Sequence, residues 1–520
     1  MQKYIPPKRT LVDVITCHAK WRSNKLALIC GEKQLSWKEF NLRINKVANS
    51  LLALGFKKGD KASVLMSNSS EMLEVIFGII KAGGVIVPLS TMVLGEVLCA
   101  MIEDSGSRVI FVDSQLQELI NPIKYRLDNV LDIGFISIGF DENGWHSYKH
   151  WIDDALGNEP HISLGFEDDF SIIYTSGTTG VPKGIVYTHF ARYIGALITA
   201  VEFGMNSRSI SLVTTPLYAN ASWLMLLPTF SVGGTLTIMQ RFDPVTFLEL
   251  IQSEKCTHTF MVPIQFIRVM EAAEFDMYDK SSLKTMVSGA ANLRKETKAK
   301  IMRLFPGDLV EIYGVTEGFS TILKPEDMEE KIDAVGKPTS AGDLRLINED
   351  GQEVPPDEEG EIVGINEALF KGYHNQPDKT REAIWHDEYG QAYVRTGDLG
   401  KLDKDGFLHI LDRKKDVIIS GGMNIYANDI EDVLAAHDEV DDTAVIGIPD
   451  KKWGETPLAL VVRKRNSSIS EDDLKEWLNL RLAKYQRVSI LEFRKSLPRS
   501  PIGKVLKRML REPYWKKHGV

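Results

Sequence analysis

The residues between Tyr174 and Gly184 combine hydroxyl groups, glycines and one lysine in a run that could hold a phosphate. The run reads Y-T-S-G-T-T-G-V-P-K-G and continues an apolar, strand-like stretch. Backbone N–H groups in such turns can surround anionic oxygens, and glycine allows the backbone to approach them closely. The lysine adds a positive charge. The run therefore predicts a polyphosphate-binding loop, and a plain surface turn is the competing interpretation of so short a motif.

Two common nucleotide-binding loops do not fit this run. A P-loop requires G-x-x-x-x-G-K-[ST], but counting from Gly177 places Pro182 at the second glycine and Gly184 at the hydroxyl position. A G-x-G-x-x-G dinucleotide turn is also absent at this place. The loop is therefore expected to bind phosphate in another way.

The segment T175-S-G-T-T-G-V-P-K-G184 resembles the phosphate-binding motif of the adenylate-forming enzymes. That superfamily includes acyl-CoA synthetases, luciferases and peptide-synthetase adenylation domains. Further motifs of the superfamily follow in order: Y313-G-V-T-E317, T396-G-D-L399 with D403–D416, S420-G-G-M-N-I-Y426 and L497-P-R-S-P-I-G-K504. Each motif alone has an ordinary structural explanation. The ordered set, spread over almost the whole chain, carries the resemblance.

The resemblance implies a two-step reaction that uses ATP, Mg²⁺ and coenzyme A. A carboxylate attacks the α-phosphorus of ATP, and pyrophosphate leaves. In the acyl-adenylate that results, AMP is a good leaving group, so a thiol can take the acyl group. The expected activity is that of an AMP-forming acid–thiol ligase, an acyl-CoA synthetase.

The resemblance also implies which residues bind the nucleotide and the metal. Thr316 would donate to the α-phosphate, Glu317 would bind magnesium, and Asp398 would accept from both ribose hydroxyls. The β- and γ-phosphates would be held by Thr175, Ser176, Gly177, Thr178, Thr179, Gly180 and Lys183. The remaining nucleotide contacts would be Gly289, Ala290, Tyr313, Gly314 and Arg413.

Two motifs near the C-terminus would serve the two half-reactions. Lys504 would neutralise the charge that develops between the carboxylate and the α-phosphate. Gly421 and Gly422 would let the pantetheine arm pass close to the backbone. Trp453, in D450-K-K-W-G-E455, would stack on the CoA adenine, with interdomain packing as an equal alternative.

The acid would bind against T215-P-L-Y-A-N-A-S-W-L224. Ala219 stands where the superfamily commonly has a histidine, and this departure predicts a roomier pocket. Peptide-synthetase domains carry an aspartate near this motif, but none lies between Val213 and Pro228, so amino acids are disfavoured. Tyr218 and Trp223 are the predicted acid contacts. Trp223 stands at the spacing of a gate tryptophan in long-chain enzymes, with an ordinary core tryptophan as the alternative.

These features predict a ligase for a hydrophobic, medium- or long-chain fatty acid. Two alternatives stay open: a fatty acyl-AMP ligase that passes the acyl group to a carrier protein, and a CoA ligase for aryl or cinnamate-type acids. A non-catalytic nucleotide-binding regulator is disfavoured because Lys504 and Glu317 are both present.

The order of apolar runs predicts the fold class. Strand-like runs such as K61–S67, R108–D113, L283–G289 and D308–G314 alternate with helical patterns such as D243–K255, which is typical of α/β layers with mostly parallel strands. An amphipathic helix is also predicted over S470–K484, where a serine followed by acidic residues is a helix-start signal. We expect an α/β fold with a large N-terminal domain, residues 1–411, of stacked mixed sheets, helices and a small β-barrel-like part. A smaller, mobile α+β domain, residues 412–520, would follow a hinge at Asp412.

Bulk composition limits the partners and the location. The 520 residues carry a net charge of −9, so no attraction to nucleic acid is expected. The run V75–L89 is interrupted by Lys81 and two glycines and is too short to span a bilayer. It predicts instead a helix that turns at A82-G83-G84 into a buried strand. Four scattered cysteines and no signal-peptide pattern favour a cytoplasmic location. Peripheral membrane contact and a homodimer stay open.

Overall fold

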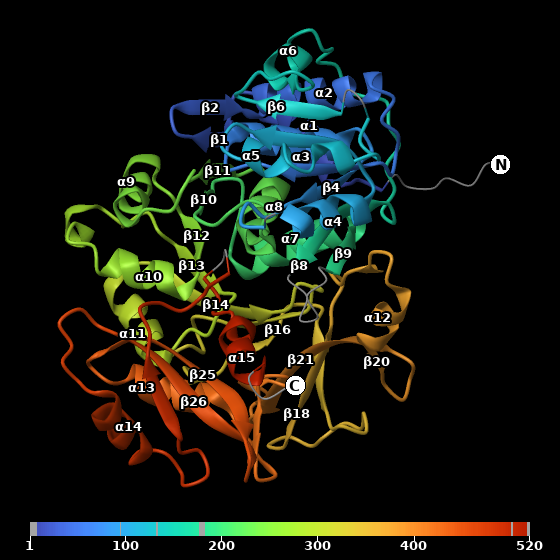
Figure 1. Cartoon of the computed structure of the whole chain (residues 1–520). Coiled ribbons are helices and arrows are strands. Elements are labelled where there is room, and N and C mark those ends of the chain that lie inside the picture. Colours follow the sequence, from blue (N-terminus) through green and yellow to red (C-terminus); the bar gives the residue numbers. More distant parts are fainter. Residues whose placement is uncertain (1–7, 94, 132–133, 176–182, 501–502, 517–520) are drawn as a thin grey trace. The chain divides into compact units, whose positions relative to one another are not determined.

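The computed structural model describes residues 8–93, 95–131, 134–175, 183–500 and 503–516 (Figure 1). The chain divides into two compact units, each described here by itself. Unit 1 comprises Met1–Met328, Pro338–Asp343 and Ile365–Ile384. Unit 2 comprises Glu329–Lys337, Leu344–Gly364 and Trp385–Val520.

One sheet of unit 1 has the strand order β19-β9-β8-β4-β3-β5-β6-β7. β9 pairs antiparallel with β8 and β19, and the other neighbours are parallel. The strands are β3 (Lys61–Leu65), β4 (Val85–Pro88), β5 (Ser107–Asp113), β6 (Phe135–Ile138), β7 (His146–Ser147), β8 (Asp169–Thr175), β9 (Lys183–Thr188) and β19 (Gly372–Tyr373).

The other sheet of unit 1 has the order β15-β14-β13-β12-β10-β11-β1-β2, parallel from β14 to β1 and antiparallel at both ends. The strands are β1 (Leu26–Cys30), β2 (Lys33–Ser36), β10 (Ile210–Val213), β11 (Thr235–Ile238), β12 (His258–Met261), β13 (Thr285–Gly289), β14 (Asp308–Gly314) and β15 (Ser320–Leu323). The short β16 (Lys337–Pro338) follows.

The helices of unit 1 connect these strands. They are α1 (Leu11–Trp21), α2 (Trp37–Ala53), α3 (Ser70–Lys81), α4 (Gly95–Ser105), α5 (Gln117–Ile120), α6 (Tyr148–Asp153), α7 (His189–Glu202), α8 (Trp223–Val232), α9 (Pro244–Glu254), α10 (Pro263–Met270), α11 (Lys295–Leu304) and α12 (Pro377–Glu382). Three 3₁₀ turns are η1 (Lys124–Arg126), η2 (Asn220–Ser222) and η3 (Phe275–Met277).

Local sequence explains several of these boundaries. The predicted change from helix to strand within V75–L89 is observed: α3 ends at Lys81 and β4 begins at Val85. Gly83 makes the turn with φ +85°, a conformation that glycine adopts without steric cost. Asp243 caps α9, since its side chain accepts a hydrogen bond of 2.9 Å from the backbone N–H of Thr246.

One hydrophobic core unites the two sheets of unit 1. It contains buried side chains of α1, α2, α3, α7 and α8 together with residues of β1, β10 and β11 from one sheet and of β3 and β5 from the other. The aromatic rings of Trp37, Phe40, Phe77 and Phe230 pack edge to face or tilted in this core, with centroids 5.3 to 6.5 Å apart. These helices therefore pack against strands of both sheets within one core.

Unit 2 contains two smaller sheets. The first is antiparallel where its pairing is described, in the order β17-β18-β21-β20, and β22 pairs with β21. Its strands are β17 (Asp343–Ile347), β18 (Glu359–Ile365), β20 (Ile384–His386), β21 (Ala392–Leu402) and β22 (Leu408–Arg413). This sheet corresponds to the predicted barrel-like part.

The second sheet of unit 2 has the order β24-β23-β26-β25, with β27 added parallel to β26. Its strands are β23 (Ile418–Ser420), β24 (Met423–Ile425), β25 (Val440–Asp450), β26 (Gly454–Arg463) and β27 (Ile490–Phe493). Three helices accompany it: α13 (Ala427–Ala435), α14 (Glu471–Asn479) and α15 (Lys507–Lys516).

The helix predicted over Ser470–Lys484 begins as expected and ends early. The Ser470 hydroxyl caps it by accepting from the backbone N–H of Asp473 at 3.1 Å. The helix ends at Asn479 because that side chain exchanges two hydrogen bonds with the backbone of Val488, at 2.9 and 3.1 Å.

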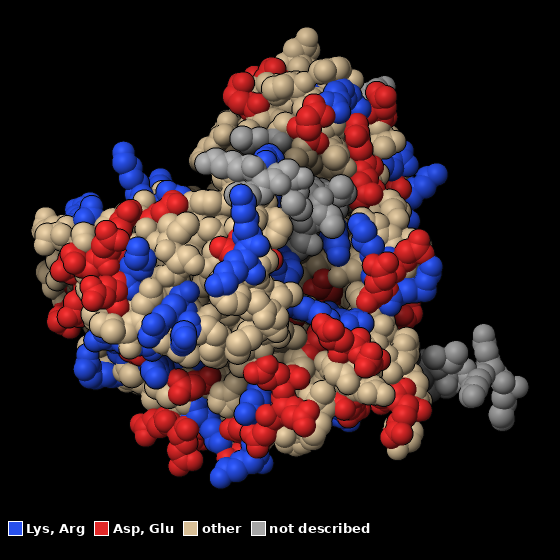
Figure 2. Space-filling model, turned by 60° about the horizontal axis from the view of Figure 1, so that its bottom comes forward, with Lys and Arg blue, Asp and Glu red and all other residues tan. Residues whose placement is uncertain are grey.

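The predicted α/β class with stacked mixed sheets and a smaller α+β region is confirmed. The predicted division at residue 412 stays a prediction. No helix in the described part of the chain has the length and apolarity needed to cross a bilayer. Figure 2 shows lysine and arginine side chains interspersed with acidic ones on the visible face.

Candidate active site

The predicted phosphate loop joins two paired strands of unit 1. Thr175 ends β8, Lys183 begins β9, and the two residues are direct partners in the antiparallel ladder. The strands therefore hold both ends of the loop together. Of the predicted loop contacts, Ser176, Gly177, Thr178, Thr179 and Gly180 lie outside the described residues.

The motif that ends β14 is fixed by backbone contacts. The carbonyl of Thr316 accepts a hydrogen bond from the Tyr187 hydroxyl, and the carbonyl of Glu317 accepts one of 2.8 Å from the N–H of Phe370. Gly318 has φ +111°, and a Cβ there would lie 2.4 Å from the carbonyl oxygen of Ala368. Glycine at this position therefore lets the turn pass close to a neighbouring segment.

Tyr373 connects this motif to the phosphate loop. Its hydroxyl donates a hydrogen bond of 2.6 Å to the carboxylate of Glu317. Lys183 Nζ lies 4.9 Å from the centroid of its ring, within the range of a cation–π contact. Burial and the neighbouring Glu317 raise the pKa of Tyr373 far above its usual value, so the hydroxyl remains a donor at all working pH values.

Sequence analysis missed Tyr373. A tyrosine between a glycine and a histidine gives no chemical signal by itself. Its position follows from the short strand β19, which pairs Tyr373 with Ile185 of β9. The pairing of K371-G-Y373 with the segment after the phosphate loop is the only signal that could have identified it.

Gly289 and Ala290 lie beside the β14 motif. β13 and β14 are parallel neighbours, so the carboxyl end of β13 meets that of β14, where ligands commonly bind in α/β sheets. A Cβ at Gly289 would lie 2.4 Å from the carbonyl oxygen of Ile312. Ala290 has φ +65°, an uncommon conformation for a residue with a side chain. Strained backbone of this kind clusters at functional sites, which makes this turn a candidate part of the site.

The predicted acid contacts form a buried wall of unit 1. Tyr218 and Trp223 are both buried, and Trp223 Nε1 donates a hydrogen bond of 2.8 Å to the carbonyl of Leu217. Arg192 of α7 lies over the Trp223 ring, 4.8 Å from its centroid. Arg192 was also missed by sequence analysis, although an arginine within an otherwise apolar helix was a visible signal.

Lys504 of unit 2 is a partly buried lysine in an unusual electrostatic setting. Burial lowers its pKa to about 7, and the nearby positive charges of Arg413 and Lys415 act in the same direction, while Asp398 and Asp416 oppose it. Lys504 therefore lies near enough to Asp398 and Arg413 to interact with their charges. These two are direct partners across β21 and β22, with Arg413 Nε 3.4 Å from Asp398 Oδ1.

Asp412, the predicted hinge residue, is buried in unit 2. Its carboxylate accepts hydrogen bonds of 2.7 Å from the backbone N–H groups of Arg413 and Ala427. Ala427 is the first residue of α13, so the carboxylate stabilises that helix at its positive end.

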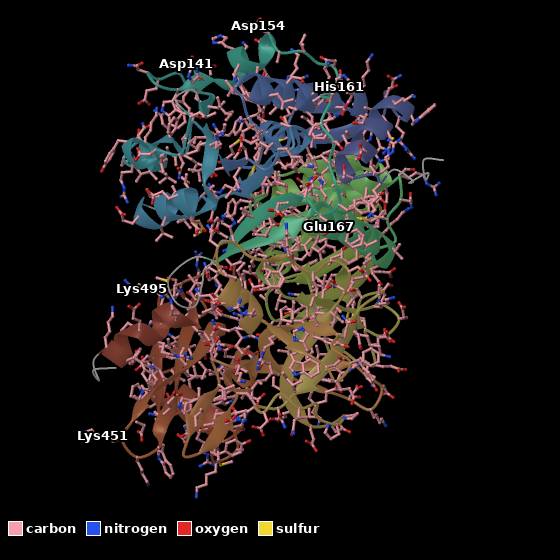
Figure 3. All side chains as sticks on the ribbon, turned by 90° about the vertical axis from the view of Figure 1, so that its right-hand side faces the viewer. Asp141, Asp154, His161, Glu167, Lys451 and Lys495 are labelled. Carbon is pink, nitrogen blue, oxygen red and sulfur yellow. The ribbon has the colours of Figure 1, made fainter. Side chains whose placement is uncertain are left out.

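Gly421 and Gly422 form the turn between β23 and β24, with φ +59° and +82°. The indole of Trp453 lies directly on Gly421, because a Cβ there would be 2.8 Å from its Cε3 atom. The carbonyl of Trp453 also accepts a hydrogen bond of 2.8 Å from the N–H of Gly421. Trp453 is 50% exposed, and Figure 3 labels Lys451 in the same turn between β25 and β26.

The residues fit a magnesium–nucleotide complex. Mg²⁺ bound to phosphate oxygens needs only one or two protein carboxylates. Glu317 offers one, and the Tyr373 hydroxyl bonds to its Oε1 atom. No group of three or more candidate metal ligands occurs in the part of the chain that was searched, the described residues.

Comparison with known proteins gives matches over almost the whole chain. The family described as AMP-binding enzyme matches residues 16–374, and the AMP-binding enzyme C-terminal domain matches residues 429–504. A long-chain-fatty-acid–CoA ligase of Mycobacterium tuberculosis is 34% identical over 92% of this chain and 93% of its own. A feruloyl-CoA synthase of Amycolatopsis is 32% identical over 95% and 97%. The structure of ATP-bound MatB from Rhodopseudomonas palustris superposes with a TM-score of 0.86 at 28% identity, covering 97% of this chain and 99% of that one.

Proposed function

We propose that this enzyme activates a hydrophobic acid. The chain belongs to the AMP-binding enzyme family. It is an AMP-forming acid–CoA ligase that uses ATP, Mg²⁺ and CoA. The class we favour is a medium- or long-chain fatty acid.

The observation that carries this proposal is that the two predicted acid contacts, Tyr218 and Trp223, are aromatic and buried. The segment from Val213 to Pro228 contains no acidic side chain that could pair with an amino acid's ammonium group. Pockets lined by apolar and aromatic side chains favour apolar ligands. The name of the mycobacterial relative, a long-chain-fatty-acid–CoA ligase, agrees with this class.

For the first half-reaction, the proposed roles divide between binding and charge stabilisation. Lys183 and the loop before it bind the β- and γ-phosphates, and Thr316 donates to the α-phosphate. Glu317, oriented by the Tyr373 hydroxyl, would hold Mg²⁺, which would supply positive charge to the phosphates. Lys504 stabilises the charge that develops as the carboxylate attacks, an effect commonly worth several kcal/mol.

For the second half-reaction, the proposed roles belong to the β23–β24 turn. Gly421 and Gly422 give the pantetheine arm a path without side chains, and Trp453 offers a half-exposed ring for the CoA adenine. The proposed domains are residues 1–411 and 412–520, with rotation at Asp412 exchanging the Lys504 turn for the glycine turn.

Two alternatives concern the acid and the thiol. An aryl acid agrees with the name of the feruloyl-CoA relative. A carrier-protein thiol in place of CoA would make the chain a fatty acyl-AMP ligase.

The test is release of AMP and pyrophosphate with Mg-ATP and a panel of acids, with and without CoA. The panel runs from short to long fatty acids and includes benzoate and cinnamate. Turnover with octanoate or longer acids that requires CoA is the expected result. A higher kcat/KM for cinnamate contradicts the fatty class, and one equivalent of pyrophosphate unaffected by CoA indicates a carrier protein.

A further inference from the structure

Arg192 of α7 is a buried cation beside the proposed acid site. Only 7% of the residue is exposed. Its guanidinium lies 3.7 Å from the centroid of the Tyr187 ring and 4.8 Å from that of Trp223. The two rings hold the guanidinium by cation–π contacts on an otherwise apolar wall.

The hydrogen bonds of Arg192 all go to neutral oxygens. Nε and Nη2 donate to the hydroxyl of Ser171 at 3.3 and 3.2 Å, and Nη1 donates to the side-chain carbonyl of Asn220 at 2.8 Å. A guanidinium has five N–H donors, so these bonds leave two without a partner among the described residues. Burial lowers the pKa of Arg192 to about 10, and the group stays charged at neutral pH.

The other fully buried cations of the described chain have carboxylate partners. Lys81 pairs with Glu159 at 2.6 Å, and Lys298 pairs with Glu311 at 2.5 Å. Arg192 has no carboxylate within ion-pair distance among the described residues. Burying a charge without a counter-ion costs free energy. A ligand that supplies a negative charge here would therefore gain much binding free energy.

The position of Arg192 indicates which ligand could supply that charge. Asn220 and Trp223, its two neighbours, belong to the proposed acid-binding segment. Tyr187, the ring under the guanidinium, donates its hydroxyl hydrogen bond to the carbonyl of Thr316 in the β14 motif. The guanidinium therefore borders the acid side of the nucleotide site. α7 and α8, which carry Arg192 and Trp223, pack against each other in unit 1 (Figure 1).

The reacting carboxylate is a poor match for this cation. It must act as a nucleophile and loses its charge when the acyl-adenylate forms, so a buried ion pair with arginine would favour the unreacted acid. A second carboxylate keeps its charge through both half-reactions. It would also form bidentate, charge-assisted hydrogen bonds with the unused donors.

We propose that Arg192 binds a second carboxylate on the substrate, so that the acid is a dicarboxylic acid with a hydrophobic body. This inference rests on the proposed function and narrows its substrate class. Arg192 is then a specificity residue, and Asn220 holds it in place until the second carboxylate replaces one of its bonds.

The experiment measures kcat/KM for pairs of acids that differ only in the second carboxylate: octanoate with octanedioate, decanoate with decanedioate, and benzoate with phthalate. The wild-type enzyme is expected to prefer the better diacid over its monoacid by about tenfold or more, the usual effect of a charge-assisted bond. Calorimetric binding of the same acids, without ATP, gives a second readout.

Two substitutions assign the effect to the guanidinium. Arg192→Met removes the charge at similar length, and the ratio of kcat/KM for the diacid to that for the monoacid is expected to fall to about one or below. Arg192→Lys keeps the charge and is expected to retain part of the preference. Arg208→Met, which changes an exposed arginine in the turn before β10, is the matched control. Thermal unfolding identifies any variant that has lost its fold.

The outcomes separate this inference from the function on which it rests. If both acids of a pair react equally, or if Arg192→Met keeps the diacid preference, the inference is overturned and the hydrophobic-acid proposal stands. If no acid gives CoA-dependent AMP, the proposed function fails. In that case, calorimetric binding of the diacids alone tests the role of Arg192. The inference is overturned if the wild type and Arg192→Met bind a diacid equally tightly, or if neither binds it.

Discussion

The two charged regions of the candidate site are stabilised in opposite ways. In unit 1, the carboxylate of Glu317 accepts from Tyr373, and Lys183 lies over the same ring. In unit 2, Lys504 is partly buried with a pKa lowered to about 7, and Nζ has no hydrogen bond or ion pair among the described residues. Glu317 and Lys183, which are proposed to bind the ligand in its ground state, both contact Tyr373. Lys504, which is proposed to act on the transition state, has no such partner among the described residues.

Lys507 provides a comparison within unit 2. It lies three residues after Lys504 and is also partly buried, but it pairs with Glu431 at 2.7 Å. The charges of Glu431 and Asp412 outweigh burial and raise its pKa. The two lysines therefore differ in their carboxylate partner and not in burial, and Lys504, the lysine proposed to be catalytic, is the one without an ion pair among the described residues.

The largest expected effect is that of Lys504→Ala. Removing a preorganised charge that acts on the transition state should slow adenylation by roughly a hundred- to a thousandfold. Thioester formation from preformed acyl-AMP should change little. Single-turnover assays of each half-reaction measure the two rates separately.

Lys507→Ala is the matched control for that experiment. It leaves Glu431 without its partner, so it should lower the melting temperature while adenylation per folded molecule is retained. Equal losses of both half-reactions in Lys504→Ala would contradict the division of roles between the two C-terminal motifs.

The next largest effect is expected in unit 1, where Tyr373 contacts Glu317 and Lys183. Tyr373→Phe keeps the ring near Lys183 and removes the hydrogen bond to Glu317, which should weaken binding of Mg-ATP by about tenfold. Binding of ATP without Mg²⁺ should change less, because the ring contact remains. Calorimetry with and without the metal measures both, and Tyr389→Phe, at an exposed tyrosine, serves as the control. An identical loss with and without Mg²⁺ would show that Tyr373 acts on the fold and not on Glu317.

A pH profile tests the lowered pKa of Lys504 directly. The group is charged below about pH 7 and neutral above it, so kcat/KM for ATP should fall as the pH rises through 7. From pH 7 to pH 8 the charged fraction falls by about fivefold if the lysine titrates alone. In Lys504→Arg, whose guanidinium stays charged, any residual activity should lack this step. A wild-type profile that is flat from pH 6 to pH 9 would contradict the lowered pKa.

The smallest effect is expected at the glycine turn. Gly421→Ala adds a Cβ that meets the movable, half-exposed indole of Trp453 at 2.8 Å and strains a backbone with φ +59°. The KM for CoA should rise about fivefold, in line with a strain of the order of 1 kcal/mol, and adenylation should be unaffected. Steady-state kinetics with CoA as the varied substrate measure it. A change in the adenylation rate instead would assign the turn to the first half-reaction.

Much of the fold followed from local sequence. The ends of β8, β13 and β14, where the motifs lie, were predicted because apolar runs stop at glycine and hydroxyl residues. Their parallel arrangement followed from alternation with helices such as α9. These features depend on neighbours along the chain, so sequence alone determines them.

The missed residues depend on contacts between distant segments. Tyr373 reaches Glu317 because β19 pairs with β9, which lies about two hundred residues earlier in the chain. Arg192 is unusual because no carboxylate of the described residues lies within ion-pair distance of it. The early end of α14 depends on Asn479 bonding to Val488. None of these partners can be identified from local patterns.

The contacts of Asp412 have a consequence for the rate at which the enzyme could change between its two proposed states. The bonds of the Asp412 carboxylate to Ala427 would move together with α13, but the side chain of Asn428 also donates a hydrogen bond of 2.9 Å to the carbonyl of Leu411, on the other side of the proposed hinge. Rotation at Asp412 must break that bond in each cycle. A neutral hydrogen bond contributes about 1 kcal/mol net, so this restraint shifts the populations of the two states by about fivefold and adds little to the barrier between them.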